Sequence, residues 1–281
     1  RTYELFETLA SATWHTIHST HQNKVSLGED AITSYSLHAI ACVGPRNVVF
    51  EDTRVNEATK GCDFELWVGA DATGWYRYAV QAKKIEVRSG RYSSLAHKVG
   101  SSLQLDILER YATANNAFPM YCLYNYFPVA DSWNCNYPKE IEQLGCSVTP
   151  SSVVRAALRK RGGRSFAHIH KQPQTLPWRC LVKCPNLIPS GSPSATAHLQ
   201  PRLFPRLPGS LQGLRELRSH ITQLDPGELF NHDIRLFPRR IAIVDLGNGA
   251  EGNLSVSRTA CKLRLQVPSA LRAPAAGYLK R

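Results

Sequence analysis

Two short segments decide the fold of this 281-residue chain: Gly61-Cys62-Asp63-Phe64-Glu65-Leu66-Trp67-Val68 and Tyr78-Ala79-Val80-Gln81-Ala82-Lys83-Lys84. Polar and apolar residues alternate in both, which is typical of β-strands because successive side chains point to opposite faces. The two carboxylates therefore share one face of the first strand, and Gln81 and Lys83 share one face of the second. Between them, residues 69–74 have the Gly and Asp content of a hairpin turn. The sequence thus predicts an antiparallel hairpin whose polar faces meet.

The facing polar groups have the chemistry of a metal-dependent nuclease site. Carboxylate oxygens bind hard cations such as Mg²⁺, and an ammonium group beside a metal-bound water stabilises the charge that develops on an attacked phosphate. We expect Asp63 to bind Mg²⁺ or Mn²⁺ and Lys83 to assist the attacking water. Glu65 is either a second catalytic ligand or a solvated strand residue. Lys84 faces away from Lys83, where it is either structural or in contact with phosphate.

This arrangement resembles the PD-(D/E)XK, or restriction-endonuclease-like, superfamily, and most closely its Mrr-like branch, whose third motif reads Gln-x-Lys. The matching residues are Asp63, Gln81 and Lys83, while Cys62 stands where the family has proline. The resemblance implies an α/β fold with a central mixed β-sheet flanked by helices, a metal held in part by Gln81, and hydrolysis of DNA phosphodiester bonds. Bacterial members commonly act in restriction or defence against foreign DNA.

Two further residues fit the same resemblance. Many members carry an acid on the helix that leads into the sheet, and Glu29, at a predicted helix start, would supply the catalytic and metal-binding carboxylate that Gln81 lacks. In related nucleases a glutamine on the helix after the lysine strand approaches the site, and Gln104 matches it; the other interpretation is an exposed polar residue. The same two interpretations apply to Tyr92. Glu57 lies in a polar loop and is expected to be solvated.

Apolar periodicity predicts the elements around the hairpin. In the first half it predicts helices at 3–17, 29–40 and 94–115, strands at 47–52 and 119–126, and hairpin strands at 63–68 and 75–87. Helix, strand, hairpin, helix, strand is the order expected of an endonuclease-like core, although many α/β domains share it. Further helices are predicted at 149–160 and 211–224, and a strand at 240–246.

Charge divides the chain into two parts. Residues 1–146 carry 13 Lys and Arg against 16 Asp and Glu, net −3, whereas residues 147–281 carry 21 against 6, net +15. We interpret 1–146 as the nuclease-like core and 147–281 as a basic C-terminal region with a Pro- and Ser-rich loop near 185–208. A basic region attracts a polyanion through phosphate contacts, so the expected partner is nucleic acid, DNA before RNA. The expected contacts are Lys84, Arg155, Arg159, Lys160 and Arg161.

Other functions are less well supported by the sequence. A nuclease fold whose catalysis has decayed, and which only binds nucleic acid, is the main alternative. A tetrahedral zinc site could use His168, His170, Cys180 and Cys184, but their spacing matches no common zinc finger. No P-loop, dinucleotide fingerprint or nucleophile elbow is present.

Composition indicates where the protein acts. The eight cysteines are scattered without a disulfide framework, no apolar run is long enough to span a membrane, and the N-terminus lacks signal-peptide character. We therefore expect a cytoplasmic protein without a membrane partner. Cutting both strands of a duplex requires two active sites, which favours a homodimer.

Overall fold

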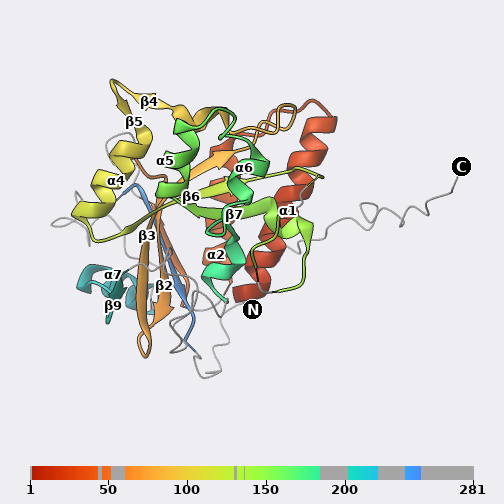
Figure 1. The fold of residues 1–281 in the computed structure, drawn as a ribbon. Coiled ribbons are helices and arrows are strands. Elements are labelled where there is room, and N and C mark those ends of the chain that lie inside the picture. Colours follow the sequence, from red (N-terminus) through yellow and green to blue (C-terminus); the bar gives the residue numbers. More distant parts are fainter. Residues whose placement is uncertain are drawn as a thin grey trace, which may run out of the picture. The chain divides into compact units, whose positions relative to one another are not determined.

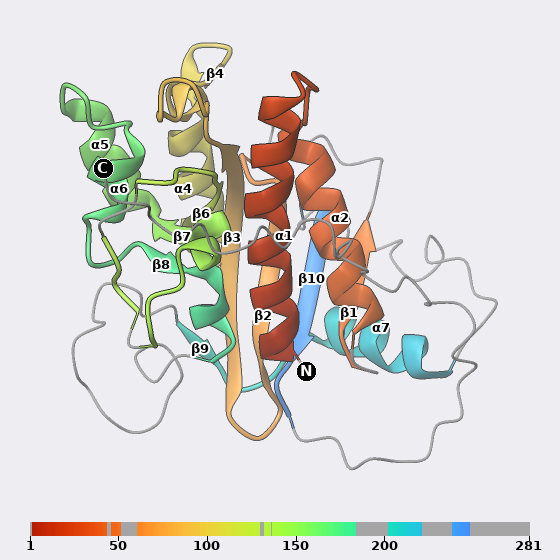
Figure 2. The ribbon, with the colours of Figure 1, turned by 90° about the vertical axis from the view of Figure 1, so that its right-hand side faces the viewer.

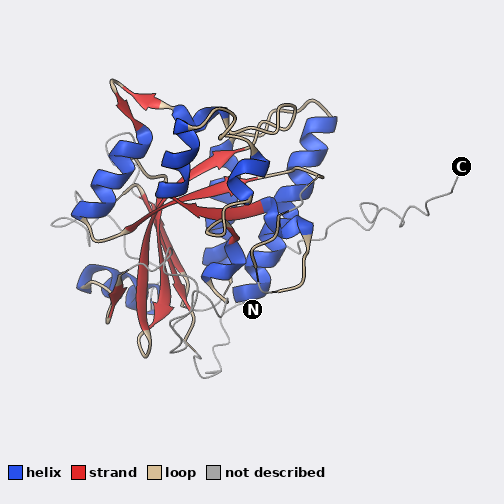
Figure 3. Cartoon of the chain, in the orientation of Figure 1, coloured by secondary structure: helices blue, strands red, loops and turns tan. Residues whose placement is uncertain are grey.

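The computed structural model describes residues 2–43, 46–51, 61–129, 132–135, 137–183, 202–220 and 238–247. Its centre is one β-sheet with helices on both faces (Figures 1 and 3). Along the sheet the strand order is β1 (Val48–Glu51), β10 (Arg240–Asp245), β2 (Phe64–Ala70), β3 (Gly74–Lys84), β6 (Phe118–Tyr124), β7 (Cys146–Pro150) and β8 (Leu176–Pro177), and β9 (Leu203–Phe204) pairs with the beginning of β3.

The sheet is mixed. β10 is parallel to β2 and β6 is parallel to β3, whereas β2 pairs with β3 as an antiparallel hairpin. The outer pairs, β1 with β10, β6 with β7 and β7 with β8, are antiparallel. The predicted α/β fold with a central mixed sheet flanked by helices is therefore confirmed.

Helices bury both faces of this sheet (Figure 2). On one face, α1 (Thr2–Gln22) and α2 (Glu29–Cys42) pack against the even-numbered residues of the hairpin, such as Leu66 and Val80. On the other face, α4 (Gln104–Ala114), α5 (Ser151–Arg159) and α6 (Phe166–His170) pack near Ala79, and α7 (Gly209–His220) packs near Trp67. Every residue of β2 is consequently buried, and in β3 only Tyr76 and Lys84 are partly exposed.

The predicted elements of the first half form where expected, with one correction. α1, α2, β1, the hairpin and β6 confirm the local patterns. The helix predicted over 94–115 is wrong in its first part: the 3₁₀-helix η1 (Ser93–Ala96) and the small hairpin of β4 (Lys98–Val99) and β5 (Ser102–Leu103) precede α4. Gly100 adopts φ +60 in this hairpin turn, a conformation that favours glycine and interrupts a helix.

The sheet continues past the boundary predicted at residue 146. β7 pairs with β6, and β10 lies between β1 and β2, so one compact unit spans Arg1–Gly247. A division at 146 and 147 therefore does not separate two compact units. The predicted helix at 211–224 is α7, described as far as His220, and the strand at 240–246 is β10. Most of the loop near 185–208 and all of residues 248–281 lie outside the described residues.

Candidate active site

The predicted site residues lie where β3 extends beyond β2. Phe64, the first residue of β2, pairs with Val80, but β3 continues to Lys84. The backbone N–H groups of Ala82 and Lys84 therefore have no strand partner on that side within the described ranges, and carboxylates accept from them instead. Ala82 N donates to Asp63 Oδ2 over 2.6 Å, and Lys84 N donates to Glu29 Oε2 over 2.8 Å. The two predicted acids thus take the place of the missing strand.

Asp63 and Gln81 form the first pair of the site. Gln81 Nε2 donates to Asp63 Oδ2 over 2.6 Å and lies 3.3 Å from the carbonyl oxygen of Ala82. Both neighbours are acceptors, which identifies this end of the amide as the NH₂ group. Gln81 is 1% exposed, and its Oε1 is buried without a hydrogen-bond partner among the described residues. A buried carbonyl oxygen left this way is costly.

Glu29 and Lys83 form the second pair. Glu29 opens α2, and its Oε1 lies 3.4 Å from Lys83 Nζ. Lys83 is 5% exposed, so its ammonium needs such a partner. Lys84 Nζ donates over 2.6 Å to the carbonyl oxygen of Leu27, just before the helix. Both lysines therefore fasten the start of α2 to the end of β3, and Lys84 has this structural contact instead of an open phosphate-facing position.

The two pairs lie next to each other along β3, because Asp63 and Glu29 accept from Ala82 N and Lys84 N, which are two residues apart. Burial is the main reason that the pKa of the Cys122 thiol is raised, and the carboxylates of Asp63 and Glu29 both add to the rise. Cys122 pairs with Ala82 across β3 and β6. The structure therefore brings Asp63, Gln81, Lys83 and Glu29 to the same end of β3.

Glu65 lies apart from this group. Its carboxylate is fully buried, and it accepts from Arg77 Nη2 over 2.6 Å, from Trp67 Nε1 over 3.1 Å and from the Tyr111 hydroxyl. Burial and the nearby Glu65 charge raise the pKa of Tyr111 far above its ordinary value, so the hydroxyl remains a donor. Glu65 shares a strand face with Asp63 as predicted, but α4 and Arg77 enclose it in the core. We assign it a structural role.

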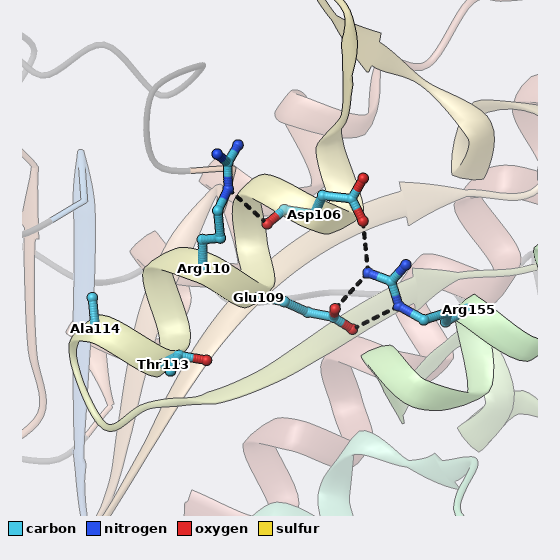
Figure 4. A pocket seen from close by; sticks show the side chains of 6 residues that line it. All are labelled: Asp106, Glu109, Arg110, Thr113, Ala114 and Arg155. Atoms are coloured by element: carbon cyan, nitrogen blue, oxygen red, sulfur yellow. Dashed lines mark hydrogen bonds and ion pairs between the residues drawn. The ribbon is translucent and has the colours of Figure 1, made fainter.

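Arg155 was predicted to contact nucleic acid, and the structure pairs it with acids. Its Nη2 lies 2.7 Å from Asp106 Oδ1 and also contacts Glu109. These three residues line an open pocket of about 460 Å³ beside α4 (Figure 4). Most of the Arg155 charge is therefore neutralised. The other predicted contacts, Arg159, Lys160 and Arg161, are exposed at the end of α5.

The remaining candidates take different places. Tyr92 is fully buried and donates to Asn125 Oδ1, so it belongs to the core. Gln104 opens α4, and its Oε1 is a second buried amide oxygen without a hydrogen-bond partner among the described residues. Glu57 lies outside the described residues.

The zinc alternative does not fit the described part of the chain. Both ring nitrogens of the buried His170 are hydrogen bonded, Nδ1 with the Phe166 carbonyl oxygen at 3.0 Å and Nε2 with Ser147 Oγ at 2.8 Å. Cys180 Sγ lies 3.5 Å from Cys135 Sγ, and Cys184 is outside the described residues. No group of three or more His, Cys, Asp and Glu side chains with the arrangement of a metal site occurs in the described ranges.

The donor set at the end of β3 nevertheless has the chemistry that Mg²⁺ requires. Mg²⁺ binds oxygen ligands, keeps several waters and commonly uses only one or two carboxylates. Asp63 and Glu29 offer two carboxylates, and Gln81 offers an amide oxygen to which no side chain or backbone group of the described ranges donates. The residues present therefore fit a Mg²⁺ or Mn²⁺ ion bound partly by water.

Fold and site together define a mixed α/β protein with a carboxylate, amide and lysine cluster at one end of its central hairpin. Residues 2–244 match the model of a family of unknown function, DUF6615, and the chain belongs to that family. No curated protein matches the sequence. None of the helices in the described ranges combines the length and apolar character needed to cross a bilayer.

Proposed function

We propose that this protein is a metal-dependent nuclease with a restriction-endonuclease-like core. The order α2, β1, β2–β3 hairpin, α4, β6 supports the proposal, because it carries the Asp63 and Gln-x-Lys positions to one end of a mixed sheet. The resemblance is also the ground for proposing DNA before RNA as substrate, and restriction or anti-phage defence as the setting.

The observation that carries the proposal is the buried Oε1 of Gln81, which has no hydrogen-bond donor in the part of the chain that the structure describes. In a folded protein a buried carbonyl oxygen is almost always satisfied. Here the Nε2 group is held by Asp63, so the amide cannot turn to relieve its oxygen without losing that bond. A cation bound by both side chains would satisfy Gln81 Oε1 and offset the Asp63 charge at once.

The site residues have distinct roles in this proposal. Asp63, Gln81 and Glu29 would hold the ion, which when bound would polarise a water and stabilise negative charge on phosphate. Ala82 N and Lys84 N orient the two carboxylates through their backbone hydrogen bonds. Lys83, held by Glu29, places a positive charge beside the attacked phosphate and orients the water. Preorganised charge of this kind is usually the largest contribution to catalysis.

A module that binds nucleic acid without cleaving it is the second candidate. Gln81 stands where most members of the superfamily have an acid, and a neutral amide binds metal less strongly than a carboxylate. Both candidate functions predict that the protein binds nucleic acid, and only the first predicts that it cleaves it.

Cleavage assays separate them. The purified chain, its Lys83→Ala variant and a Lys139→Ala control would be incubated with plasmid, single-stranded DNA and RNA in Mg²⁺, Mn²⁺ or EDTA. Lys139 is exposed and precedes η2 (Ile141–Gly145), far along the chain from the site. We expect metal-dependent cutting by wild type and control and at least a 10²-fold loss in Lys83→Ala. Binding without cutting by wild type would favour the second candidate.

A further inference from the structure

A second feature of the molecule is a group of basic side chains from two segments that are distant in sequence. One is the loop that follows β3, residues 86–92, and the other runs from the end of α5 through α6, residues 159–171. We call their lysines and arginines the basic surface. Its members are Arg88, Arg91, Arg159, Lys160, Arg161, Arg164 and Lys171.

Backbone hydrogen bonds join the two segments. Tyr92 N donates to the Arg164 carbonyl oxygen and Phe166 N donates to the Gly90 carbonyl oxygen, each over 2.9 Å. Arg91 and Ser165 form an isolated β-bridge between these bonds. Arg164 also donates from its guanidinium to the Ser93 carbonyl oxygen over 3.0 Å. The fold thus fixes the spacing between charges that lie about seventy residues apart in sequence.

The charge of this surface is almost entirely positive. Residues 159–171 contain five Lys or Arg and no Asp or Glu, and residues 86–92 contain two Arg and one acid, Glu86. Five of the seven basic residues are exposed, and Arg91 and Arg164 are half-buried. Burial first, and then the positive charges of Lys160 and Lys171, lower the pKa of His168. The positive charges of Lys160 and Lys171, at opposite ends of the segment, therefore both affect His168.

The basic surface begins at the end of β3 that carries the site. Ile85, the next residue after Lys84, donates its N–H to the Tyr124 carbonyl oxygen and leads directly into the loop with Arg88. The opposite end of β3 pairs with β9, and the strand between them rises about 3.3 Å per residue. Arg88 therefore follows Lys83 by five residues at the same end of β3, opposite to the end that pairs with β9.

We propose that the basic surface holds the phosphate backbone of a nucleic acid and leads it to the candidate site, without reading its sequence. This inference rests on the proposed function for the identity of the polyanion. Arginine and lysine contacts to phosphate give affinity and register but no base information. Sequence-tolerant stacking of bases requires exposed aromatic rings. Among the described residues the exposed large hydrophobic side chains are Val25, Tyr35, Val129 and Leu203, and all four lie outside the two segments.

The test measures binding separately from cleavage. Fluorescence anisotropy in EDTA would give the Kd of labelled single- and double-stranded DNA of two unrelated sequences. We expect Lys160→Ala/Arg161→Ala to raise Kd roughly tenfold for every sequence, and to lower the slope of log Kd against log salt by about 2. Arg88→Ala, on the other segment, should lower the slope by about 1.

A matched control removes the same charge elsewhere. Arg202 and Arg206 are exposed on either side of β9, at the far end of β3, so screening by salt limits their effect on a ligand at the basic surface. Arg202→Ala/Arg206→Ala should leave Kd within about twofold of wild type. Equal losses in both double variants would show that net charge, and not this surface, governs binding, and would overturn the inference.

Two further outcomes are informative. Cleavage and binding that do not depend on Lys160, Arg161 or Arg88 would overturn the inference and leave the proposed function standing. Binding that depends on them without any cleavage would support the inference while the proposed function fails. Sedimentation with vesicles containing phosphatidylserine would show whether anionic lipid is the polyanion instead; binding to vesicles but not to DNA or RNA would overturn the inference.

Discussion

Gln81 Nε2 donates a 2.6 Å hydrogen bond to Asp63 Oδ2, and this bond holds the other end of the amide, Oε1, in a buried position where no described residue donates to it. The pair joins the beginning of β2 to the end of β3. An amide here tolerates the absence of metal, because its NH₂ group neutralises part of the Asp63 charge through a hydrogen bond. A second carboxylate would lack that hydrogen bond and would repel Asp63.

The first prediction follows from this pair. In EDTA, Gln81→Glu should lower stability by about 1–3 kcal/mol, because two carboxylates then face each other in a buried position. Mg²⁺ should restore most of the loss and raise the melting temperature of Gln81→Glu more than that of wild type. Thermal unfolding with and without Mg²⁺ measures both effects.

Gln143→Glu is the matched control for this experiment. Gln143 is also buried, and its Oε1 likewise has no hydrogen-bond partner among the residues described, but its Nε2 faces the carbonyl oxygen of Glu7. We expect Gln143→Glu to be destabilised and Mg²⁺ to give no rescue. If Mg²⁺ stabilised the two variants equally, the ion would not be bound by Gln81 and Asp63.

The second prediction concerns the buried pair of Arg77 and Glu65. Removing one partner leaves an uncompensated buried charge, so Arg77→Met should cost about 3–5 kcal/mol in urea unfolding. Arg77→Met/Glu65→Gln should cost less than Arg77→Met alone, because the orphaned carboxylate is then neutral. A Glu65→Gln protein that folds but no longer responds to Mg²⁺ would instead place Glu65 among the metal ligands.

The third prediction concerns pH. Burial lowers the pKa of His170 from 6.5 to about 4, partly offset by its hydrogen bond with the Phe166 carbonyl oxygen. The unfolded chain therefore binds this proton more readily than the folded protein, and stability falls as pH decreases from about 6.5 to about 4. One pKa unit is worth about 1.4 kcal/mol, so the loss at pH 4 is roughly 3 kcal/mol.

Urea unfolding between pH 7 and pH 4 measures this loss. The His170→Gln variant, which cannot take up the proton, should lose less stability over the same range, whatever its stability at pH 7. Parallel curves for the two proteins would show that another group is responsible for the acid sensitivity.

The fourth prediction concerns Arg155. Its guanidinium is paired with Asp106 and Glu109, so it contributes little free charge to a polyanion. The double variant Arg155→Met/Glu109→Gln removes one positive and one negative charge together. It should therefore bind DNA with a Kd within about twofold of wild type, because a surface ion pair of this kind contributes little free energy. A loss as large as that of Lys160→Ala/Arg161→Ala would instead return Arg155 to the nucleic-acid contacts.

Much of the hairpin could be predicted from sequence because its pattern is local. Alternation along residues 61–68 and 78–84 determines which side chains share a face, and the turn between the strands determines that they are antiparallel. The positions of Asp63, Gln81 and Lys83 follow from these two facts. The start of α2 at Glu29 is equally local, since apolar spacing and an acidic first turn mark it.

Only the tertiary structure determines which of these polar side chains are enclosed in the core and which lie at the end of β3. Glu65 has the strand position that the sequence predicts for a second metal-binding acid, yet Arg77 and Tyr111 enclose it because α4 covers that face. Lys84 is drawn to Leu27 because α2 begins there. Whether a side chain is covered depends on elements far away in sequence, which a local pattern does not contain.

The division of the chain shows the same limit. Composition separates an acidic first half from a basic second half, but β10 lies between β1 and β2 although about 170 residues separate Ala70 from Arg240. The distribution of charged residues mainly describes the protein surface. Strand pairing instead depends on backbone hydrogen bonds and on burial of apolar faces, so charge does not predict it. The sequence by itself determined the central hairpin, most of the elements before residue 146 and the residue types of the candidate site. The long-range pairing of strands decided where these residues lie, which acids accept from the N–H groups at the end of β3, and which charges share the basic surface.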